Sequence, residues 1–281
     1  MPAADRTPVL PDLGDDARLL AEAAAHAGTV ALGFFRKSPE VWTKGDASPV
    51  SEADLAADRA IGEMLRAARP GYGWISEESA AAPAASGEGR SFIVDPIDGT
   101  RAFIAGGEDW TVSLAVVEDG RPIAAAVFCP VRGEMFLAAR GAGAWQGARR
   151  LAATAPSSLA GGRIAGPAPL IEARAMRAAG LERVGKIHSL AYRLTLVAAG
   201  RIDAAVASAR ACHWDLAAAD LLVHEAGGRL IDLAGRTVRY DVPDHRHPPL
   251  VAAGEALYGP LAALVAAVVA DPASSSGGSG R

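Results

Sequence analysis

The sequence predicts an α+β half followed by an α/β half, with a cleft where the two halves meet. Strand-like runs follow one another after Trp110, whereas helices and strands alternate from about Leu151. The chain has 281 residues, 50% of them hydrophobic, which is enough to bury a large core. We therefore expect lobes at residues 15–150 and 151–270, between a flexible N-terminus (1–14) and a disordered Ser- and Gly-rich tail (271–281).

Composition limits the class of protein. A net charge of −4 and a pI near 5.9 argue against a nucleic acid polymer as partner, because phosphate backbones bind clustered Lys and Arg. The two cysteines, Cys129 and Cys212, have the spacing of neither a zinc site nor a disulfide framework. No signal peptide is recognised, and charges interrupt every apolar run that could span a membrane. We therefore expect a cytoplasmic protein without a membrane segment.

The first half begins with two predicted helices. Apolar residues three and four apart predict an amphipathic helix from Asp15 to Phe34. Residues 37–49 are polar and contain Gly and Pro, which predicts a mobile loop. Ser-Glu-Ala-Asp at residues 51–54 then opens a second helix, which ends before Pro70.

Strands and loops follow. Trp-Ile-Ser-Glu-Glu at residues 74–78 predicts a strand that ends in two acids, and residues 80–89 predict a surface loop that can move over a site. Residues 110–118, 123–128 and 134–138 predict an antiparallel meander with Asp-Gly and Arg-Gly turns. In the second half we expect helices at residues 170–179, 190–199, 215–226 and 257–269, and strands at residues 183–187, 202–207 and 250–252.

The stretch Phe-Ile-Val-Asp-Pro-Ile-Asp-Gly-Thr-Arg at residues 92–101 is the centre of the predicted site. An apolar run delivers Asp95 and Asp98, and Pro96 lies between them. Period-two spacing alone does not place both acids on one face of a strand, but a turn at Pro96 can fold Asp98 back beside Asp95.

Glu77 and Asp215 also follow apolar or aromatic residues at the ends of predicted elements. Carboxylates crowded into one pocket repel one another unless cations neutralise them, and a set of oxygen ligands suits Mg²⁺. The four acids therefore predict a magnesium site. Glu78 is expected to be only solvated, because the pattern places Glu77 closer to the strand end.

The same residues allow a plainer interpretation. Taken alone, Asp98, Gly99 and Thr100 are typical of a helix cap. If a helix begins there, its free N–H groups also form an anion site beside the metals. The sequence has no P-loop, which argues against ATP-driven phosphoryl transfer by that route, and it has no Asp-x-Asp phosphatase signature.

Four segments, in order, resemble the magnesium-dependent, lithium-sensitive phosphatases typified by inositol monophosphatase. They are residues 51–54, 74–78, 95–100 and Trp-Asp-Leu-Ala-Ala at 214–218, within a resemblance that runs from about residue 15 to 270. The resemblance implies a layered αβαβα sandwich like that of fructose-bisphosphatase. Two departures are Ser51, where the family commonly has Thr, and Ile-His-Ser-Leu at 187–190, where it has Gly-Ser-Ser or Gly-Ser-Ala.

The resemblance also implies roles for individual residues. It implies two or three Mg²⁺ ions, the first held by Glu77, Asp95 and the carbonyl of Ile97, and a second between Asp95, Asp98 and Asp215. The implied catalytic residues are Asp54, Thr100 and Glu77, with Thr100 and Asp54 orienting and deprotonating the attacking water. The implied substrate contacts are Asp98, Gly99, Thr100, Arg101, Ser189 and Asp215. The residues themselves leave open that Ser51 and Asp54 form a capping box, and both roles can hold at once.

The implied activity is that of a phosphoric monoester hydrolase acting on a small phosphorylated metabolite through a metal-activated water. Residues 98–103 and 108–112 resemble the bacterial adenosine 3',5'-bisphosphate phosphatases, also called 3'(2'),5'-bisphosphate nucleotidases, so we expect the 3'-phosphate as the target. Arg101 would then lie near the second phosphate. Histidinol phosphate and inositol-1-phosphate are the alternatives, and a catalytically idle binder of phosphate compounds is the alternative of another class.

Other residues are open to two interpretations. His188 and Tyr192 are candidates for contacts with a nucleotide base, unless both simply lie on an amphipathic helix. His213 either touches the site or only packs, and His245 and His247 are predicted to lie in a loop. A homodimer is expected from the resemblance alone.

Overall fold

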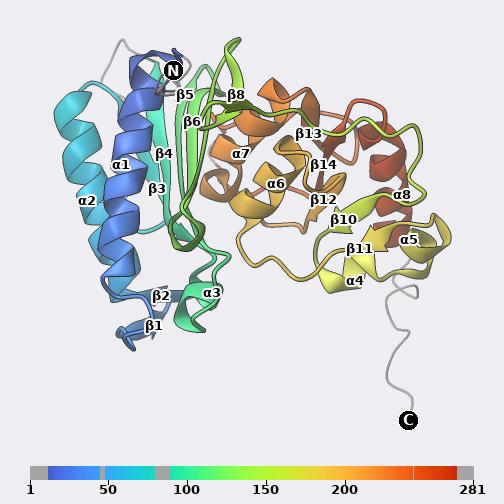
Figure 1. Cartoon of the computed structure of the whole chain (residues 1–281), viewed down its shortest axis with the longest axis horizontal. Helices are drawn as coiled ribbons and strands as arrows, with labels where there is room; N and C mark the ends of the chain where they lie inside the picture. Colours follow the sequence, from blue (N-terminus) through green and yellow to red (C-terminus); the bar gives the residue numbers. More distant parts are fainter. Residues whose placement is uncertain (1–11, 45–47, 80–88, 243, 271–281) are drawn as a thin grey trace, which may run out of the picture.

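The computed structural model describes residues 12–44, 48–79, 89–242 and 244–270. Within these ranges it forms five layers of helices and sheets (Figure 1). The expectations for residues 1–11, 80–88 and 271–281 lie outside the described residues. The division into lobes at residue 150 stays a prediction, because the central helices pack on both sheets.

The larger sheet has seven strands in the order β3-β4-β5-β6-β7-β8-β9. These strands are Gly73–Ser76 (β3), Arg90–Asp98 (β4), Thr111–Glu118 (β5), Arg121–Cys129 (β6), Glu134–Ala139 (β7), Gly143–Gln146 (β8) and Arg149–Arg150 (β9). β3 is parallel to β4, and every other neighbouring pair is antiparallel. The predicted meander is therefore confirmed in β5, β6 and β7.

The smaller sheet has five strands in the order β11-β10-β12-β14-β13. Its strands are Arg163–Ala165 (β10), Glu182–Arg183 (β11), Ala204–Ala207 (β12), Gly228–Asp232 (β13) and Leu250–Gly254 (β14). β10 is parallel to β11 and β12, whereas β14 runs antiparallel to β12 and β13. β10 and β13 were not predicted, because both are short and carry few residues with strong β propensity.

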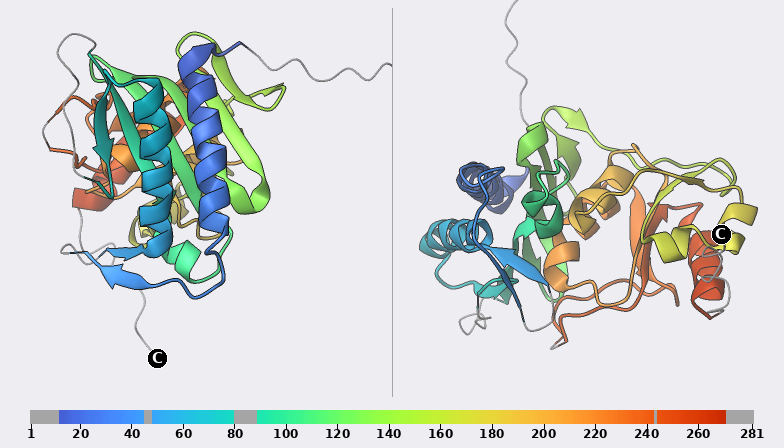
Figure 2. Two further views of the ribbon diagram at one scale, coloured as in Figure 1. Left: turned by 90° about the vertical axis from the view of Figure 1, so that its left-hand side faces the viewer. Right: turned by 90° about the horizontal axis from the view of Figure 1, so that it is seen from below.

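Helices occupy the three remaining layers. Helices α1 (Gly14–Leu32) and α2 (Glu52–Ala68) lie side by side across the outer face of the larger sheet (Figure 2). The central layer is α6 (Leu190–Ala198) and α7 (His213–Glu225), and α4 (Ala168–Ile171), α5 (Arg174–Ala178) and α8 (Tyr258–Ala270) cover the smaller sheet. This order of layers confirms the predicted αβαβα sandwich.

Strand alternation explains why each sheet carries helices on both faces. On β4, Phe92 and Val94 pack in the cluster of α1 and α2, whereas Ile93 packs in the cluster of α6 and α7. On β14, Ala252 faces the central helices and Val251 faces α8. Both faces of each sheet are therefore apolar, which is why these strands read as continuous apolar runs.

Three predictions about local structure were wrong. Residues 37–49 were expected to be a loop, but Val41–Thr43 (β1) and Pro49–Ser51 (β2) pair as an antiparallel hairpin. The expected helix at residues 170–179 is divided into α4 and α5, because Ala173 is extended (ψ 148°), which lets both short helices bury apolar residues. The strand expected at 183–187 ends at Arg183, because the residues that follow line a cavity.

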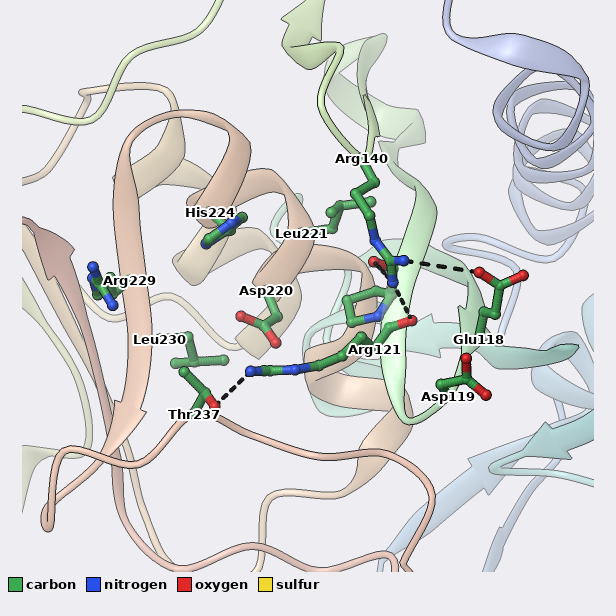
Figure 3. Close-up of a pocket in the computed structure, with 11 residues that line it drawn as sticks. Glu118, Asp119, Arg121, Arg140, Asp220, Leu221, His224, Arg229, Leu230 and Thr237 are labelled. Carbon is green, nitrogen blue, oxygen red and sulfur yellow. Dashed lines mark hydrogen bonds and ion pairs between the residues drawn. The ribbon is translucent and has the colours of Figure 1, made fainter. Parts of the chain in front are cut away.

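A polar connection joins the larger sheet to the chain after β13. Arg121, at the start of β6, donates from Nη1 to the carbonyl of Val238 over 2.9 Å and from Nη2 to Thr237 Oγ1 over 2.6 Å. Arg121 and Thr237 line a cavity of about 320 Å³ together with Asp220 of α7 (Figure 3). Asp220 accepts a hydrogen bond from Tyr240 Oη at 3.0 Å, and its burial raises the pKa of its carboxyl group to about 7.

The raised pKa of Asp220 predicts that the stability of the protein depends on pH. Because the pKa of this group is raised in the fold, its stabilising contribution is present at low pH and is lost as the pH rises through about 7. Asp220→Asn stays neutral and can still accept from Tyr240, so its stability relative to the wild type should be higher at about pH 8.5 than at about pH 5.5. Each pKa unit corresponds to about 1.4 kcal/mol.

Thermal unfolding at the two pH values measures this difference, with Asp119→Asn, at an exposed acid of the same cavity, as the matched control. An equal Tm difference between Asp220→Asn and wild type at both pH values would contradict the assignment.

Candidate active site

Three carboxylates meet where β4 ends and α7 begins. Asp95 and Asp98 come from the last residues of β4, and Asp215 comes from the first turn of α7. One oxygen of each lies within 4.8 Å of the others. The structure therefore brings together three of the four acids that the sequence assigned to a metal site.

A bulge in β4 places Asp95 and Asp98 together. Asp95 pairs with Ser113 of β5 and Asp98 with Thr111, so three steps along β4 match two along β5. Without this extra residue, a spacing of three would put the two side chains on opposite faces of the sheet. The two acids were expected to meet through a turn at Pro96, but they meet inside an irregular strand.

Only one of the two carboxylate oxygens of Asp95 accepts a hydrogen bond from a described residue. Its Oδ1 accepts the backbone N–H of Ile97 at 3.0 Å, whereas its Oδ2 is buried and has no hydrogen-bond partner among the described residues. A buried carboxylate oxygen without a partner carries a substantial desolvation cost. Only a group that is absent from the protein chain itself, such as a cation, would complete its coordination.

Asp98 and Asp215 are anchored by helix N-termini. Asp98 Oδ2 accepts from Ser189 Oγ at 2.6 Å and from the N–H of Ala191 at 2.5 Å, at the start of α6. Asp215 Oδ2 accepts from the N–H of Cys212 at 2.6 Å, at the start of α7. Both helices present positive dipole ends to these acids, which favours their ionised forms.

The electrostatics of the cluster are unfavourable without a cation. Burial, and then the charges of Glu77, Asp98 and Asp215, raise the pKa of Asp95 well above its ordinary value. Burial and the charge of Asp98 also raise the pKa of Asp215 well above its ordinary value. The all-oxygen donor set and the orphaned oxygen of Asp95 fit a hard divalent cation such as Mg²⁺.

Lys44 pairs with both acids at the end of β3. Its Nζ lies 2.9 Å from Glu77 Oε1 and 2.6 Å from Glu78 Oε1. The expectation that Glu78 is only solvated was wrong, because its side chain is 3% exposed and its burial raises its pKa to about 7. Glu77 lines the same cavity as the three aspartates, but its carboxylate is already neutralised by Lys44.

A second group of hydrogen bonds joins α2 to the end of β4. Asp54 Oδ2 accepts from the N–H and the Oγ of Ser51, at 2.8 Å and 2.6 Å. Asp54 Oδ1 lies 3.0 Å from Thr100 Oγ1, which is also 3.0 Å from the carbonyl oxygen of Ile97. Asp54 therefore takes part in the capping box of α2 and contacts Thr100 at the same time, and its catalytic role stays a prediction.

Gly99 links the acids to the short helix α3 (Thr100–Ile104). Its φ of 97° lies in the left-handed region, and a Cβ there would stand 3.2 Å from the backbone nitrogen of Ser189. Only glycine meets both conditions without strain. An anion site at the start of α3 stays a prediction.

One cavity of about 470 Å³ gathers most of the predicted residues. Its lining includes Glu77, Asp95, Ile97, Asp98, Gly99, Thr100, Arg101 and Asp215. Ser189 is fully buried and is not part of this lining, so its observed role is to hold Asp98. Arg183, Lys186 and Arg193 also line the cavity, and none of them was singled out from the sequence.

The aromatic and histidine candidates lie in different places. His188 lines the cavity, and its Nδ1 lies 3.0 Å from Asp109 Oδ2, just before α6. Tyr192 is buried away from the cavity lining, where its hydroxyl donates to Glu134. His213 packs against the rings of His245 and His247 and is likewise outside the cavity lining.

Comparison with known proteins decides the family. Residues 15–270 match the model of the inositol monophosphatase family. The chain belongs to the inositol monophosphatase family. This membership confirms the resemblance found in the sequence and identifies the chain as a phosphoric monoester hydrolase.

The proteins that are similar to this chain carry the names of several different proteins. It is 37% identical to a glucose-1-phosphate thymidylyltransferase of Streptomyces griseus over 80% of this chain and 88% of the relative. It is 38% identical to an inositol-1-monophosphatase of Rhizobium meliloti, over 70% of this chain and 76% of the relative, and to a histidinol-phosphatase of Mycobacterium tuberculosis, over 69% and 77%. The crystal structure of the extragenic suppressor protein suhB from Bartonella henselae has a TM-score of 0.80 at 31% identity, over 88% of this chain and 97% of that one.

Two further observations concern the described residues of this family member. None of the helices in those residues combines the length and apolarity required to cross a membrane. Arg193 was missed as a site residue, although it is the only charged residue between Leu190 and Ala199. A lone charge in an apolar helix is a signal that could have directed attention to it.

The cluster of Asp95, Asp98 and Asp215 predicts that Mg²⁺ stabilises the folded protein. Because binding to the native state alone raises stability, saturating Mg²⁺ should raise the Tm of the wild type by several degrees, and a chelator should reverse this. Asp95→Asn removes one of the repelling charges, so without metal it should unfold at a higher temperature than the wild type and respond weakly to Mg²⁺. Differential scanning calorimetry measures both effects. An unchanged Mg²⁺ response in Asp95→Asn would exclude Asp95 as a ligand.

Proposed function

We propose that this chain is a Mg²⁺-dependent phosphomonoesterase that hydrolyses a small phosphorylated metabolite with water as the nucleophile. The observation that carries this proposal is the free, buried oxygen of Asp95 inside a cluster of three carboxylates. The cluster lies at one end of a cavity large enough for a small metabolite. Membership of a phosphatase family supports the same reaction class.

The residues divide into metal ligands and a proton acceptor. We assign Glu77, Asp95, Asp98, Asp215 and the carbonyl of Ile97 to holding two or three Mg²⁺ ions. When bound, Mg²⁺ lowers the pKa of water and stabilises charge on the phosphate and on the leaving oxygen. For Glu77 to become a ligand, its carboxylate must exchange Lys44 for the cation.

Thr100 and Asp54 form the proposed proton path. The Thr100 hydroxyl carries one proton, and donating it to Asp54 over 3.0 Å leaves the oxygen lone pairs free to accept from water in the cavity. Burial is the largest influence on Asp54 and raises the pKa of its carboxyl group, against the opposing hydrogen bonds from Ser51 and Thr100. A raised pKa makes a carboxylate a better general base near neutral pH. The Ser51 hydrogen bonds hold Asp54 in this orientation.

For the substrate, we propose adenosine 3',5'-bisphosphate, with its 3'-phosphate at the acid cluster. Arg101 supports this choice, because it lines the cavity next to Thr100 and can attract a second anionic group. The names of two relatives favour the alternatives inositol-1-phosphate and histidinol phosphate. A catalytically idle phosphate binder would need no proton acceptor, whereas the Thr100–Asp54 pair offers one.

Substitution of the acids tests the reaction. Asp95→Asn and Asp98→Asn should abolish Mg²⁺-dependent phosphate release while the fold, followed by circular dichroism, remains intact. Thr100→Val removes the hydroxyl and should lower kcat by about 10²- to 10⁴-fold. Glu63→Gln, at an exposed acid of α2, is the control with unchanged kcat. Full activity of Asp95→Asn at saturating Mg²⁺ would overturn the scheme.

A substrate panel tests the specificity. Phosphate release from adenosine 3',5'-bisphosphate, inositol-1-phosphate, histidinol phosphate and fructose bisphosphate should be highest for the first, and lithium should inhibit it. A clear preference for inositol-1-phosphate or histidinol phosphate would replace our first choice. No Mg²⁺-dependent release from any of them would favour the idle binder.

A further inference from the structure

A carboxylate and an imidazole form a pair that takes no part in the proposed metal binding or water activation. His188 Nδ1 lies 3.0 Å from Asp109 Oδ2, and the backbone N–H of His188 donates to the same oxygen at 2.5 Å. The side chain of Asp109 is 18% exposed and that of His188 is 33% exposed. One largely buried carboxylate oxygen therefore fixes both the backbone and the ring of His188.

This pair lies against the chain that carries the acid cluster. The backbone N–H of Ser189 donates to the carbonyl oxygen of Asp109 at 3.2 Å. A Cβ at Gly99, the residue directly after Asp98, would stand 3.1 Å from that same carbonyl oxygen. The ring of His188 lines the active cavity. The pair therefore belongs to a cavity wall that begins one residue from the acid cluster.

The hydrogen bond to Asp109 decides which ring nitrogen of His188 can face a substrate. An ionised carboxylate only accepts, so the proton of this bond belongs to Nδ1. Nε2 forms no hydrogen bond with any described residue, while the ring lines the cavity. A histidine at a cavity wall with a carboxylate behind it has the orientation that a general acid or base requires.

The proposed reaction requires a proton donor that the Thr100–Asp54 pair does not supply. That pair accepts a proton from the attacking water, whereas the leaving oxygen of an alkyl phosphate must gain one to depart as an alcohol. The guanidinium groups that line the cavity hold their protons too firmly for this task. His188 is the only histidine among the described residues of the cavity lining.

We propose that His188 is the general acid that protonates the leaving oxygen, and that Asp109 is its positioning residue. This inference rests on the proposed function and adds one step to it. The bond from phosphorus to the leaving oxygen breaks, its electron pair stays on that oxygen, and a proton moves to it from His188 Nε2. The ring keeps its Nδ1 proton on Asp109. Solvent water then returns a proton to Nε2 and removes the one that Asp54 accepted, so the net reaction consumes one water.

A purely structural role of this pair would have a different signature. Loss of the pair would then displace Ser189, and through it Asp98, and would slow every substrate by the same factor. A general acid matters only where the leaving oxygen needs a proton. p-Nitrophenyl phosphate releases a phenolate that is stable as an anion near neutral pH. p-Nitrobenzyl phosphate, which is longer by a single methylene group, releases an alkoxide that must be protonated.

Steady-state kinetics with these two esters test the role of His188. In His188→Gln, kcat for p-nitrobenzyl phosphate should fall about 10²-fold or more, whereas kcat for p-nitrophenyl phosphate should change little. Asp109→Asn should produce a smaller fall for the same ester, because the ring loses its orienting carboxylate. His26→Gln, at an exposed histidine of α1, is the matched control and should leave both values unchanged.

NMR of the imidazole nitrogens provides a readout that does not need turnover. The resonances of His188 are identified by their absence in His188→Gln. In the wild type, the neutral ring should carry its proton on Nδ1, as the bond to Asp109 requires. Asp109→Asn should return the ring to a mixture of both tautomers. Circular dichroism verifies that both variants are folded.

The outcomes separate this inference from the proposed function. Equal falls of kcat for both esters in His188→Gln would overturn the general-acid role and leave the phosphatase intact. A wild-type ring with its proton on Nε2 in the neutral form would overturn it as well. Absence of Mg²⁺-dependent phosphate release from every substrate, both nitro esters included, would overturn the proposed function, and the role of His188 with it.

Discussion

Mutual repulsion among Asp95, Asp98 and Asp215 is the constraint on which the rest of the structure depends. Their oxygens lie within 4.8 Å of one another in a largely buried position, so the fold must hold them against their own electrostatics. It does so with backbone N–H groups from a strand and two helices. Each donor comes from an element that is itself packed in the core, so the acids cannot separate without disturbing that core.

The central helical layer allows this arrangement because its side chains are small. Ala217, Ala218 and Ala219 of α7 are all buried, and α7 packs against both α6 and the larger sheet. Small residues let the helix approach the sheet closely, which places the N-terminus of α7 beside the end of β4. Small residues bury less apolar area, so each contributes less to the free energy of folding. Larger side chains from the strands, such as Ile93 and Val127, supply that area within the same cluster.

The sequence predicted elements and the positions of acids well where a local pattern carried the information. Ser51 and Asp54 form a capping pattern that indicates the start of α2, and the apolar run before Asp95 indicates β4. The bulge between Asp95 and Asp98 was not predictable, because it depends on pairing with β5. The pairing of Glu78 with Lys44 and the position of Arg193 in the cavity wall were missed for the same reason, because both depend on tertiary packing. The pairing of β1 and β2 was missed because each strand has only three residues and all of β1 is exposed, so neither shows a clear burial pattern.

Two half-buried cations near the acids, Lys44 and Arg193, differ in a way that the acids explain. Lys44 lies beside two glutamates and is paired with both, so it compensates charge inside the protein. Arg193 lies beside two aspartates whose hydrogen bonds are directed at helix N-termini, so it receives through-space attraction without a contact. A flexible ammonium can release Glu77 when another cation arrives, whereas a guanidinium fixed in a packed helix keeps its donors in place. Lys44 is therefore able to exchange one of its partners, whereas Arg193 keeps a fixed positive charge beside Asp98 and Asp215.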